Sequence, residues 1–439
     1  MKWIVGTLIL LLIGFVLQLS LLVYSMYVLG GILFVTRTLS AIWIKGLQCS
    51  RQIHQTEAEI GDIVKISVKL KNIHPFNIPW VLFEEEGPKD DLICTPVKLQ
   101  LKGPRLGIER FKSGAIKFWT YEATMKARGY YVFGPAQVET GDVFGLHRKH
   151  RTFGKRDGVL VLPKVLPILR NQWASNRALG ETRITHRLFE DPARFSGIRP
   201  YQAGDPLNRI HWRATARAGE LQTRMFDPSC IQGATLVVDF HASSFGGGKD
   251  HGEAELLVTT TASLAHAFDE AGEQIGLVAL AGNKAERIQQ EDREALKRLY
   301  RPWFSSQPRE KRQLEQSIIV PTRKGGGQLQ VIKEALAKME FAGDAMFDEW
   351  IIEYKNWLPR DASVIVLAHE LTSALIQGIV TLKASGYRVS MVQVNWQSEL
   401  KPDWAAPSEE RAELAATGVP CFHVRQEEDI AWLGSDLLI

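Results

Sequence analysis

The stretch ATLVVDF (Ala234–Phe240) decides the architecture of the C-terminal half of the chain. Its apolar residues run up to Asp239 without the alternation of apolar and polar positions that a half-exposed strand shows. A continuous apolar run of this length predicts a strand that is buried on both faces of a sheet. The aspartate would then lie at the carboxyl end of that strand, which is where open α/β sheets bind ligands.

Strands and helices alternate on the C-terminal side of this run. We expect a long amphipathic helix over about Gly252–Gly272 and a second one around Thr372–Ala384. Between and after them come the apolar runs Ile275–Gly282, Ser363–His369 and Arg388–Val394. Such alternation indicates a parallel, doubly wound sheet, and we predict an α/β domain over residues 230–439.

The residues DFHAS (Asp239–Ser243) resemble the Asp-x-Ser-x-Ser cluster that holds Mg²⁺ in von Willebrand A-type domains. Hard oxygen ligands of this kind suit that ion. Here His241 replaces the first serine, and His369 stands where a second acidic residue is expected. Asp239 and Ser243 are therefore the remaining candidate ligands. We expect Mg²⁺ to bind weakly or not at all, and we expect no other cofactor.

The N-terminus predicts a membrane anchor over residues 1–48. No charged residue occurs from Trp3 to Thr36, a run of 34 positions. One membrane crossing needs about 20 apolar residues, so the run is long for one helix and tight for two. We favour a helical hairpin that turns near Gln18–Ser20 or Gly30–Gly31, and a single span stays open.

The charges beside this run predict its orientation. Lys2 precedes it, and Arg37, Lys45 and Arg51 follow it. Positive flanks stay on the cytoplasmic side of a membrane. Both the hairpin and the single span therefore place the later residues in the cytoplasm, so that the protein would be a cell-membrane protein with cytoplasmic soluble domains.

Residues 51–165 predict a β-rich domain. VKISVKL (Val64–Leu70) alternates apolar and polar residues, and the aromatic-rich stretches Ile116–Met125 and Tyr130–Val138 indicate further strands. A small β-sandwich or barrel accommodates them. The aromatic residues fit core packing or base stacking. Core packing is the better interpretation because no basic groove pattern accompanies them.

The composition and the sequence motifs argue against several classes of function. The 53 basic residues nearly cancel the 49 acidic ones, so no global charge favours nucleic acid. The four cysteines are far apart and form neither a disulfide framework nor a zinc motif. No HExxH, GxSxG or P-loop pattern occurs. The chain therefore has no positive sign of an enzyme, and a charged stretch over Lys284–Lys324 is interpreted as a solvated helical insertion.

An arginine-rich segment over residues 185–228 precedes the α/β domain. In it, "GDP" predicts a helix from Pro206 to about Ala218, with Asp205 as its N-cap and Gly219 as its stop. Arg209, Arg213 and Arg217 would share one face of that helix. Ile210 and Trp212 would point into the protein. Because the segment contains no lysine from Asp191 to Pro228, we expect fixed arginine geometry, in a structural network between domains or in an anion or partner site.

The same segment is similar to the signature of the domain of unknown function 58 family, R-x-Y-x-x-G-D-x-x-x-x-I-x-W-x-x-x-A-R. The matching residues are Arg199, Tyr201, Gly204, Asp205, Ile210, Trp212, Ala216 and Arg217. The resemblance implies a membrane-anchored protein of undefined biochemistry with a von Willebrand A-like C-terminal domain. It also implies two partners, a MoxR-type AAA+ ATPase and a membrane protein with a transglutaminase-like domain.

Two functions follow from these observations. The first is a membrane-anchored, cytoplasm-facing adaptor or assembly factor that works through protein–protein contacts. The second is an enzyme or binding protein that acts on an anionic envelope precursor at the membrane face. The absence of catalytic signatures favours the first, and the lysine-free arginine cluster keeps the second open.

Overall fold

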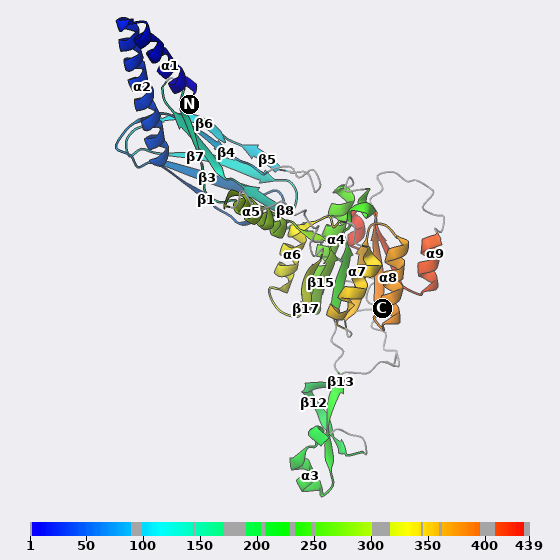
Figure 1. The fold of residues 1–439 in the computed structure, drawn as a ribbon. Coiled ribbons are helices and arrows are strands. Elements are labelled where there is room, and N and C mark those ends of the chain that lie inside the picture. Colours follow the sequence, from blue (N-terminus) through cyan, green and yellow to red (C-terminus); the bar gives the residue numbers. More distant parts are fainter. Residues whose placement is uncertain are drawn as a thin grey trace. The chain divides into compact units, whose positions relative to one another are not determined.

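The fold comes from a computed structural model of the chain. It describes residues 2–88, 99–143, 145–169, 190–202, 207–228, 233–246, 251–300, 317–343, 346–359, 362–395 and 409–433. The chain divides into two compact units. One contains residues 1–164 and 336–338, and the other contains residues 165–335 and 339–439 (Figure 1).

Two N-terminal helices form a hairpin, α1 (Lys2–Val16) and α2 (Ser20–Lys45) (Figure 1). The chain reverses at Gln18, which has a positive φ of 56°, at the first of the two expected positions. A Cβ atom on Gly14 would lie 2.3 Å from Leu22 Cδ2, so the glycine allows the helices to approach closely. Only α2, among the described helices, is long and apolar enough to cross a membrane. The 15 residues of α1 reach about 22 Å, less than a hydrocarbon core of about 30 Å.

A β-sandwich follows α2 in the same unit. Its two larger sheets are antiparallel and have the strand orders β1-β3-β7-β5 and β10-β9-β4-β6, and a smaller sheet has the order β2-β11-β8. The strands are β1 (Leu47–Ile53), β2 (Glu57–Ala58), β3 (Ile63–Asn72), β4 (Ile78–Glu85), β5 (Leu99–Lys102), β6 (Leu106–Phe111), β7 (Ile116–Met125), β8 (Gly129–Phe133), β9 (Ala136–Gly141), β10 (Arg148–Phe153) and β11 (Asp157–Val161).

The alternation seen in the sequence sets which residues are buried. In β3, Val64, Ile66 and Leu70 are fully buried, and the lysines between them face outward. The run Tyr130–Val138, expected as one strand, is two strands. The chain breaks at Gly134, whose φ of 83° does not fit an extended strand, and β8 and β9 join different sheets.

The sandwich is centred on one apolar core, and α2 contributes to it. Trp43 and Ile44, near the end of the helix, belong to the same buried cluster as the inward-facing strand residues. A buried arginine, Arg51, closes the opposite end of β1. Its Nε donates to Glu85 Oε1 at 2.6 Å, and its Nη1 donates to Asp157 Oδ2 at 2.8 Å. The helix and the sandwich are therefore one packed body.

The second unit contains a six-stranded sheet with the strand order β17-β15-β14-β19-β20-β21. Five of these strands are parallel, and only the edge strand β17 runs antiparallel. The connections lead outward from β14 in both directions, which is the doubly wound arrangement predicted from the sequence. The strands are β14 (Gly233–Asp239), β15 (Gln274–Leu280), β17 (Ile318–Arg323), β19 (Ser363–Ala368), β20 (Val389–Val394) and β21 (Cys421–Val424).

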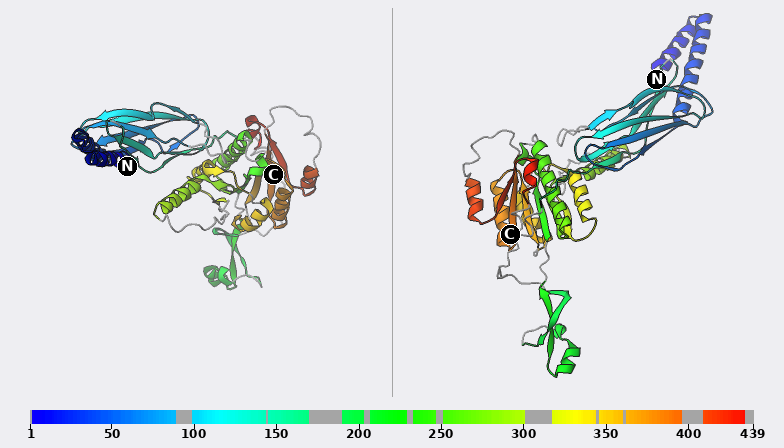
Figure 2. Two further views of the ribbon diagram at one scale, coloured as in Figure 1. Left: turned by 45° about the horizontal axis from the view of Figure 1, so that its top comes forward. Right: turned by 180° about the vertical axis from the view of Figure 1, so that it is seen from behind.

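Helices cover both faces of this sheet (Figure 2). Val237, Val278 and Val366 pack with α7 and α8 on one face. On the other face α4 crosses the strands and is buried over most of its circumference, because α10 and the segment before Leu169 cover its outer side. The helices are α4 (His251–Glu270), α6 (Gln328–Lys338), α7 (Phe347–Tyr354), α8 (Ser373–Ala384), α9 (Glu409–Ala416) and α10 (Glu427–Ile430).

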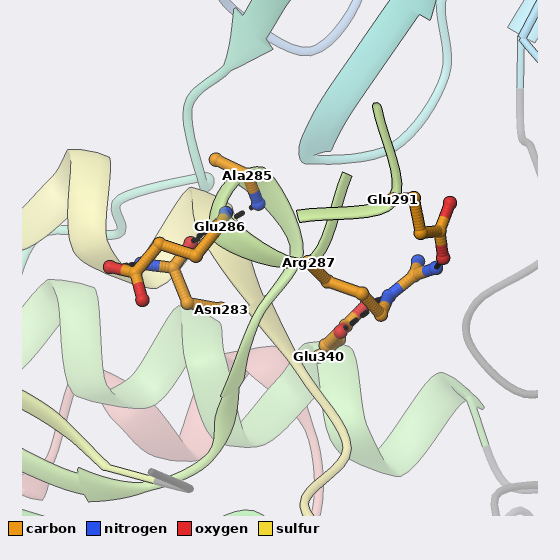
Figure 3. Close-up of polar contacts among 6 residues, drawn as sticks. All are labelled: Asn283, Ala285, Glu286, Arg287, Glu291 and Glu340. Carbon is orange, nitrogen blue, oxygen red and sulfur yellow. Dashed lines mark hydrogen bonds and ion pairs between the residues drawn. The ribbon is translucent and has the colours of Figure 1, made fainter. Parts of the chain in front are cut away.

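The charged stretch after β15 begins as the helix α5 (Lys284–Tyr300). Asn283 caps it, since its Oδ1 accepts from the backbone N of Ala285 at 3.1 Å. Arg287 Nε donates to both carboxylate oxygens of Glu340, at 2.8 and 3.1 Å, and its Nη1 donates to Glu291 (Figure 3). Glu340 lies in the two-residue strand β18 (Met339–Glu340), which pairs with β16 (Gly282–Asn283). These contacts fix the first turns of α5 to the sheet.

Candidate functional site

Asp239 ends strand β14 at the crossover point of the doubly wound sheet. From β14 the chain leads to β15 on one side and later to β19 on the other, and open α/β sheets bind ligands at the carboxyl ends of strands at such a crossover point. Asp239 is only 2% exposed. Its Oδ1 is buried without a hydrogen-bond partner among the described residues. A charged carboxylate in this position is poorly solvated.

The charge state of Asp239 follows from that environment. Burial raises the pKa of its carboxyl group from an ordinary 3.8 to about 7, and hydrogen bonds from the His241 backbone and the Ser244 side chain act in the opposite direction. The carboxyl group is thus protonated over most of the acidic range and titrates near neutral pH. Perturbed titration of this kind occurs at functional sites and also at buried structural positions.

Aromatic rings cover the carboxyl end of β14. Phe240 stacks on Phe341 with ring centroids 4.9 Å apart, and Phe245 contacts both rings. The backbone supports this cover, because Ala342 N donates to Phe240 O at 2.9 Å and Ala242 N donates to Ala342 O at 3.2 Å.

His369 follows β19 and lies at the same edge of the sheet. Its ring stacks on Phe245 at 5.1 Å. Nδ1 lies 2.8 Å from the backbone oxygen of Val394, and Nε2 lies 2.8 Å from Glu253 Oε2 in the first turn of α4. Both ring nitrogens thus face oxygen acceptors. This histidine connects β19, β20 and α4, and neither of its nitrogens is left to bind a metal.

Ser243, the other candidate metal ligand, lies in a different environment from Asp239. Ser243 is exposed, and its Oγ lies 3.0 Å from His241 Nε2. Ser244, its neighbour, is buried and lies 3.3 Å from His241 Nδ1. Across the described part of the chain, no three His, Cys, Asp or Glu side chains converge as a metal-binding group. The geometry at this edge is that of a hydrogen-bonded and stacked network.

The arginine-rich segment forms a separate structural element, which we name the arginine hairpin. It consists of the strands β12 (Glu190–Pro200) and β13 (Gln222–Pro228), with the 3₁₀ turn η2 (Leu207–Arg209) and the helix α3 (Trp212–Ala218) between them. The strands pair antiparallel, with Arg199 opposite Thr223 and Pro200 opposite Gln222.

The helix in this hairpin is shorter than the sequence predicts. It begins at Trp212 and not at Pro206, and His211 caps it by accepting from Ala214 N at 3.1 Å. Arg209 lies in the preceding 3₁₀ turn, so only Arg213 and Arg217 share a helical face. The predicted stop is confirmed, because Gly219 has a left-handed φ of 74°. The expected N-cap Asp205 and the signature residue Gly204 lie outside the described residues.

The exposure of the signature residues corrects a second expectation. Ile210 is buried at 4%, as predicted, but Trp212 is 67% exposed and does not point inward. Arg213 and Arg217 are exposed, and neither forms an ion pair with a described residue. Arg199 is half-buried and donates to Pro200 O at 3.3 Å, and Tyr201 N donates to Leu221 O at 2.8 Å. Within the described residues of the hairpin, Arg213 and Arg217 are thus solvent-exposed, and the network between domains stays a prediction.

A groove runs along α3 within the hairpin. Its volume is about 530 Å³. The residues that line it are Ile198, His211, Arg213, Ala214, Arg217 and Ala218. The groove joins an apolar floor to two arginines whose planar forks can each bind a carboxylate or a phosphate group through two hydrogen bonds.

The sequence did not predict several residues of the network at the sheet edge or of the arginine hairpin. Glu253 and Phe245 complete the sheet-edge network, yet Glu253 lies far from His369 in the chain and no local pattern connects them. His211 was not predicted as the N-cap of α3, because histidine lacks the short side chain of a usual N-cap. The pair Asp205–Pro206 before it is a stronger signal for the start of a helix. Phe245 could have been suspected from its position just after the β14 strand.

Residues 197–318 match the protein family described as "Protein of unknown function DUF58". The matched range contains the signature from Arg199 to Arg217 and the first two strands of the sheet. The family matched is therefore the one that the signature resembles. The β-sandwich and the N-terminal helices lie outside the matched range.

A curated relative is the "Uncharacterized protein YeaD" of Bacillus subtilis (strain 168). It is 26% identical over 250 residues, which cover 55% of this chain and 58% of that protein. The chain thus spans less than two thirds of the length of this relative. Its name assigns no activity.

Solved structures show only distant likeness. Proximal thread matrix protein 1 from the mussel byssus has a TM-score of 0.29 at 12% identity, over 47% of this chain and 46% of that one. The pilus adhesin SpaC from Lactobacillus rhamnosus GG also has a TM-score of 0.29, at 14% identity, over 45% of this chain and 29% of that one. Similarities this low carry no functional argument.

Proposed function

We propose that the chain is a membrane-anchored adaptor or assembly factor that binds a protein partner through the arginine hairpin. The observation that carries the proposal is the exposure of Trp212, Arg213 and Arg217 together on one short helix. Tryptophan and arginine are the residue types most enriched at the energetic centres of protein interfaces. Leaving all three exposed on one short helix has no evident benefit for folding.

The anchor and the orientation belong to the same proposal. The helix α2 supplies a segment of sufficient length and apolar character. The positive flank at Arg37, Lys45 and Arg51 supports a cytoplasmic location of the later residues. The partner would then be met at the cytoplasmic face of the membrane.

The α/β domain would serve as the von Willebrand A-like part of this adaptor. The doubly wound sheet and the position of Asp239 at the end of β14 support that assignment. His241 and His369 replace oxygen ligands, and His369 is already engaged by Val394 and Glu253. We therefore propose contacts that do not depend on Mg²⁺, with a dissociation constant for the ion weaker than micromolar.

The partner proposed by resemblance is a MoxR-type AAA+ ATPase, and a membrane protein with a transglutaminase-like domain is a second candidate. The arginines favour a partner surface that offers carboxylates. The test is recovery of the ATPase with the full-length protein from solubilised membranes, with and without ATP. We expect Trp212→Ala or Arg217→Ala to weaken binding roughly thirtyfold, the effect of losing about 2 kcal/mol at an interface centre.

Matched controls are available on the same chain. Trp357 is 62% exposed and Arg388 is also exposed, and both lie outside the hairpin. Trp357→Ala and Arg388→Ala should leave partner recovery unchanged. Equal recovery with the hairpin variants and with the controls would remove the basis of the proposal.

The groove supports the second candidate, binding of an anionic envelope precursor. Its volume of about 530 Å³ falls within the range of small-molecule sites. This candidate predicts that a soluble phosphorylated precursor protects the groove residues, His211 for example, from chemical modification. It also predicts that protein partners are recovered equally well with and without Arg213→Ala and Arg217→Ala.

A further inference from the structure

The end of the β-sandwich that receives α2 carries an unusual surface. Three turns lie there, and their described residues are 73–77, 112–115, and 142, 143 and 145–147; the strands beside them all start or finish at that end. Contacts hold them together. Asn72 Nδ2 donates to Lys112 O at 3.1 Å, Ser113 N donates to Asn77 Oδ1 at 3.0 Å, and Trp80 Nε1 donates to Asp142 O at 3.0 Å.

Large apolar side chains are exposed on these turns. Ile73 is 49% exposed, Phe76 54%, Val143 74% and Leu146 39%. Water-soluble domains rarely gather such residues at one end unless a partner or a membrane covers them. The turns are short and their shape is set by the strands, so the exposure does not come from a long loop.

Basic side chains surround the same end. Lys45, Lys112 and Lys149 are exposed there, and Arg148 is 66% exposed, with its nearest carboxylate, Glu139, 3.7 Å away. The three turns contain a single acidic residue, Asp142, and it is 1% exposed. The opposite end of the sandwich differs, because Glu57, Glu59 and Asp62 are all exposed there.

The position of this end relative to α2 is fixed by direct contacts. Ile73 N donates to Gly46 O at 2.8 Å, immediately after the helix. Trp43 and Ile44 belong to the sandwich core, and α2 also contacts β9 and β10. A span of about 20 residues that begins at Ser20 ends near Leu39, and Gly46 lies about 10 Å further on. That distance puts the turns at the headgroup layer of a membrane that α2 crosses.

We infer that this end of the sandwich, here called the membrane-facing foot, docks onto an anionic lipid surface. Val143, Leu146, Ile73 and Phe76 would insert at the headgroup level, and Lys112, Arg148 and Lys149 would contact lipid phosphates. Amphipathic surfaces that combine apolar side chains with lysine and arginine bind in this way. The inference rests on the proposed membrane anchor, and it adds that the foot holds the sandwich against the bilayer.

The basic residues on the edge strand β10 also have an alternative explanation, which is protection of the sheet edge. β10 is the outer strand of its sheet, and Arg148, Lys149 and Arg151 are exposed along it. Charges on an edge strand also prevent pairing with other chains. Edge protection alone does not require the apolar side chains of the neighbouring turns, so lipid contact accounts for both observations together.

The test uses the full chain reconstituted in liposomes. Flotation with the liposomes after alkaline extraction first tests the anchor itself. A fluorophore is then attached at Val143→Cys, in a chain whose native cysteines are replaced by serine, and quenching by nitroxide-bearing lipids is measured. The matched control is Ile60→Cys, because Ile60 is 41% exposed at the opposite end of the same sandwich.

We expect strong quenching at position 143 and none at position 60. In liposomes that contain phosphatidylglycerol, quenching at 143 should exceed that in phosphatidylcholine alone. Each basic side chain near an anionic surface changes the docking equilibrium by a factor of roughly five. Lys149→Glu should therefore reduce the difference between the lipids, and Lys126→Glu, at the far end of the sandwich, should keep it.

The outcomes distinguish the claim of a membrane anchor from the claim that the foot docks onto lipid. Protein that floats with the liposomes but shows equal, weak quenching at both positions keeps the anchor and overturns the foot. Quenching at 143 that is the same in neutral and anionic lipid overturns the role of the basic residues. Protein that does not float overturns the anchor, and the foot falls with it.

Discussion

Replacing Asp239 by asparagine removes a titratable group and keeps its shape. The carboxyl group is 2% exposed, and burial raises its pKa from 3.8 to about 7. The two values are about three pH units apart, and each unit corresponds to 1.36 kcal/mol, so ionising Asp239 in the folded state costs about 4 kcal/mol. Relaxation of the site reduces this figure, and we expect Asp239→Asn to stabilise the α/β domain by about 2–4 kcal/mol at pH 8.

The raised pKa of Asp239 determines how its contribution to folding stability changes with pH. Between about pH 4 and pH 7 the folded state holds a proton at Asp239 that the unfolded state has released. The contribution of Asp239 to stability therefore falls as the pH rises through that window, and it is constant above it. Below pH 4 the carboxyl group is protonated in both states. The gain from Asp239→Asn should then shrink toward zero.

The assay is urea unfolding of the full-length protein in detergent at several pH values. Hydrogen exchange of peptides from β14 and β19 assigns the transition to the α/β domain. The matched control is Glu370→Gln, because Glu370 is exposed at the same edge of the sheet. We expect it to change stability by less than about 0.5 kcal/mol at any pH.

Two results would refute the reasoning about Asp239. One is an equal effect of Asp239→Asn at pH 5 and pH 8, since the cost of burying the charge must grow between them. The other is a loss of stability at pH 8, which would show that the ionised carboxylate is used, by a cation for example. Addition of Mg²⁺ would distinguish that case, because a bound ion would stabilise only the parent protein.

The remaining predictions concern the arginines and the orientation. Arg51→Ala should destabilise the β-sandwich by about 3–5 kcal/mol in urea unfolding, because Glu85 would stay buried without its partner. Arg51→Lys should recover little of this loss, since a lysine cannot reach Glu85 and Asp157 together. Arg217→Ala should change stability by less than about 1 kcal/mol, and a loss of several kcal/mol would favour the domain-brace interpretation instead. A reporter enzyme fused to the C-terminus should be active in the cytoplasm, and activity on the outer side would contradict the orientation.

Local patterns in the sequence predicted the elements in which one physical effect dominates. The apolar run before Asp239 and the alternation in β3 both report burial directly, and the structure places them as expected. Thr372 was expected at the start of its helix, and it is the N-cap of α8. Gly219 ends α3 because only its backbone adopts the left-handed conformation without strain.

Other features depend on contacts between distant parts of the chain. The break at Gly134 depends on Arg51, because a Cβ atom there would lie 1.9 Å from the guanidinium Nη2. The antiparallel direction of β17 has no local signal in the sequence. The exposure of Trp212 also contradicts the usual preference of large aromatic residues for the interior. The last of these exceptions lies in the arginine hairpin, where we propose a function.

The hydrogen bonds of Arg51 have a consequence for the order in which the protein is made. Arg51 follows α2 in the chain and leaves the ribosome early, but its partners Lys155 and Asp157 are synthesised about a hundred residues later. Until then its guanidinium group lacks two of the acceptors that compensate its burial. A nascent chain that stops before β11 thus holds an incomplete sandwich in which the buried guanidinium group lacks part of its compensation.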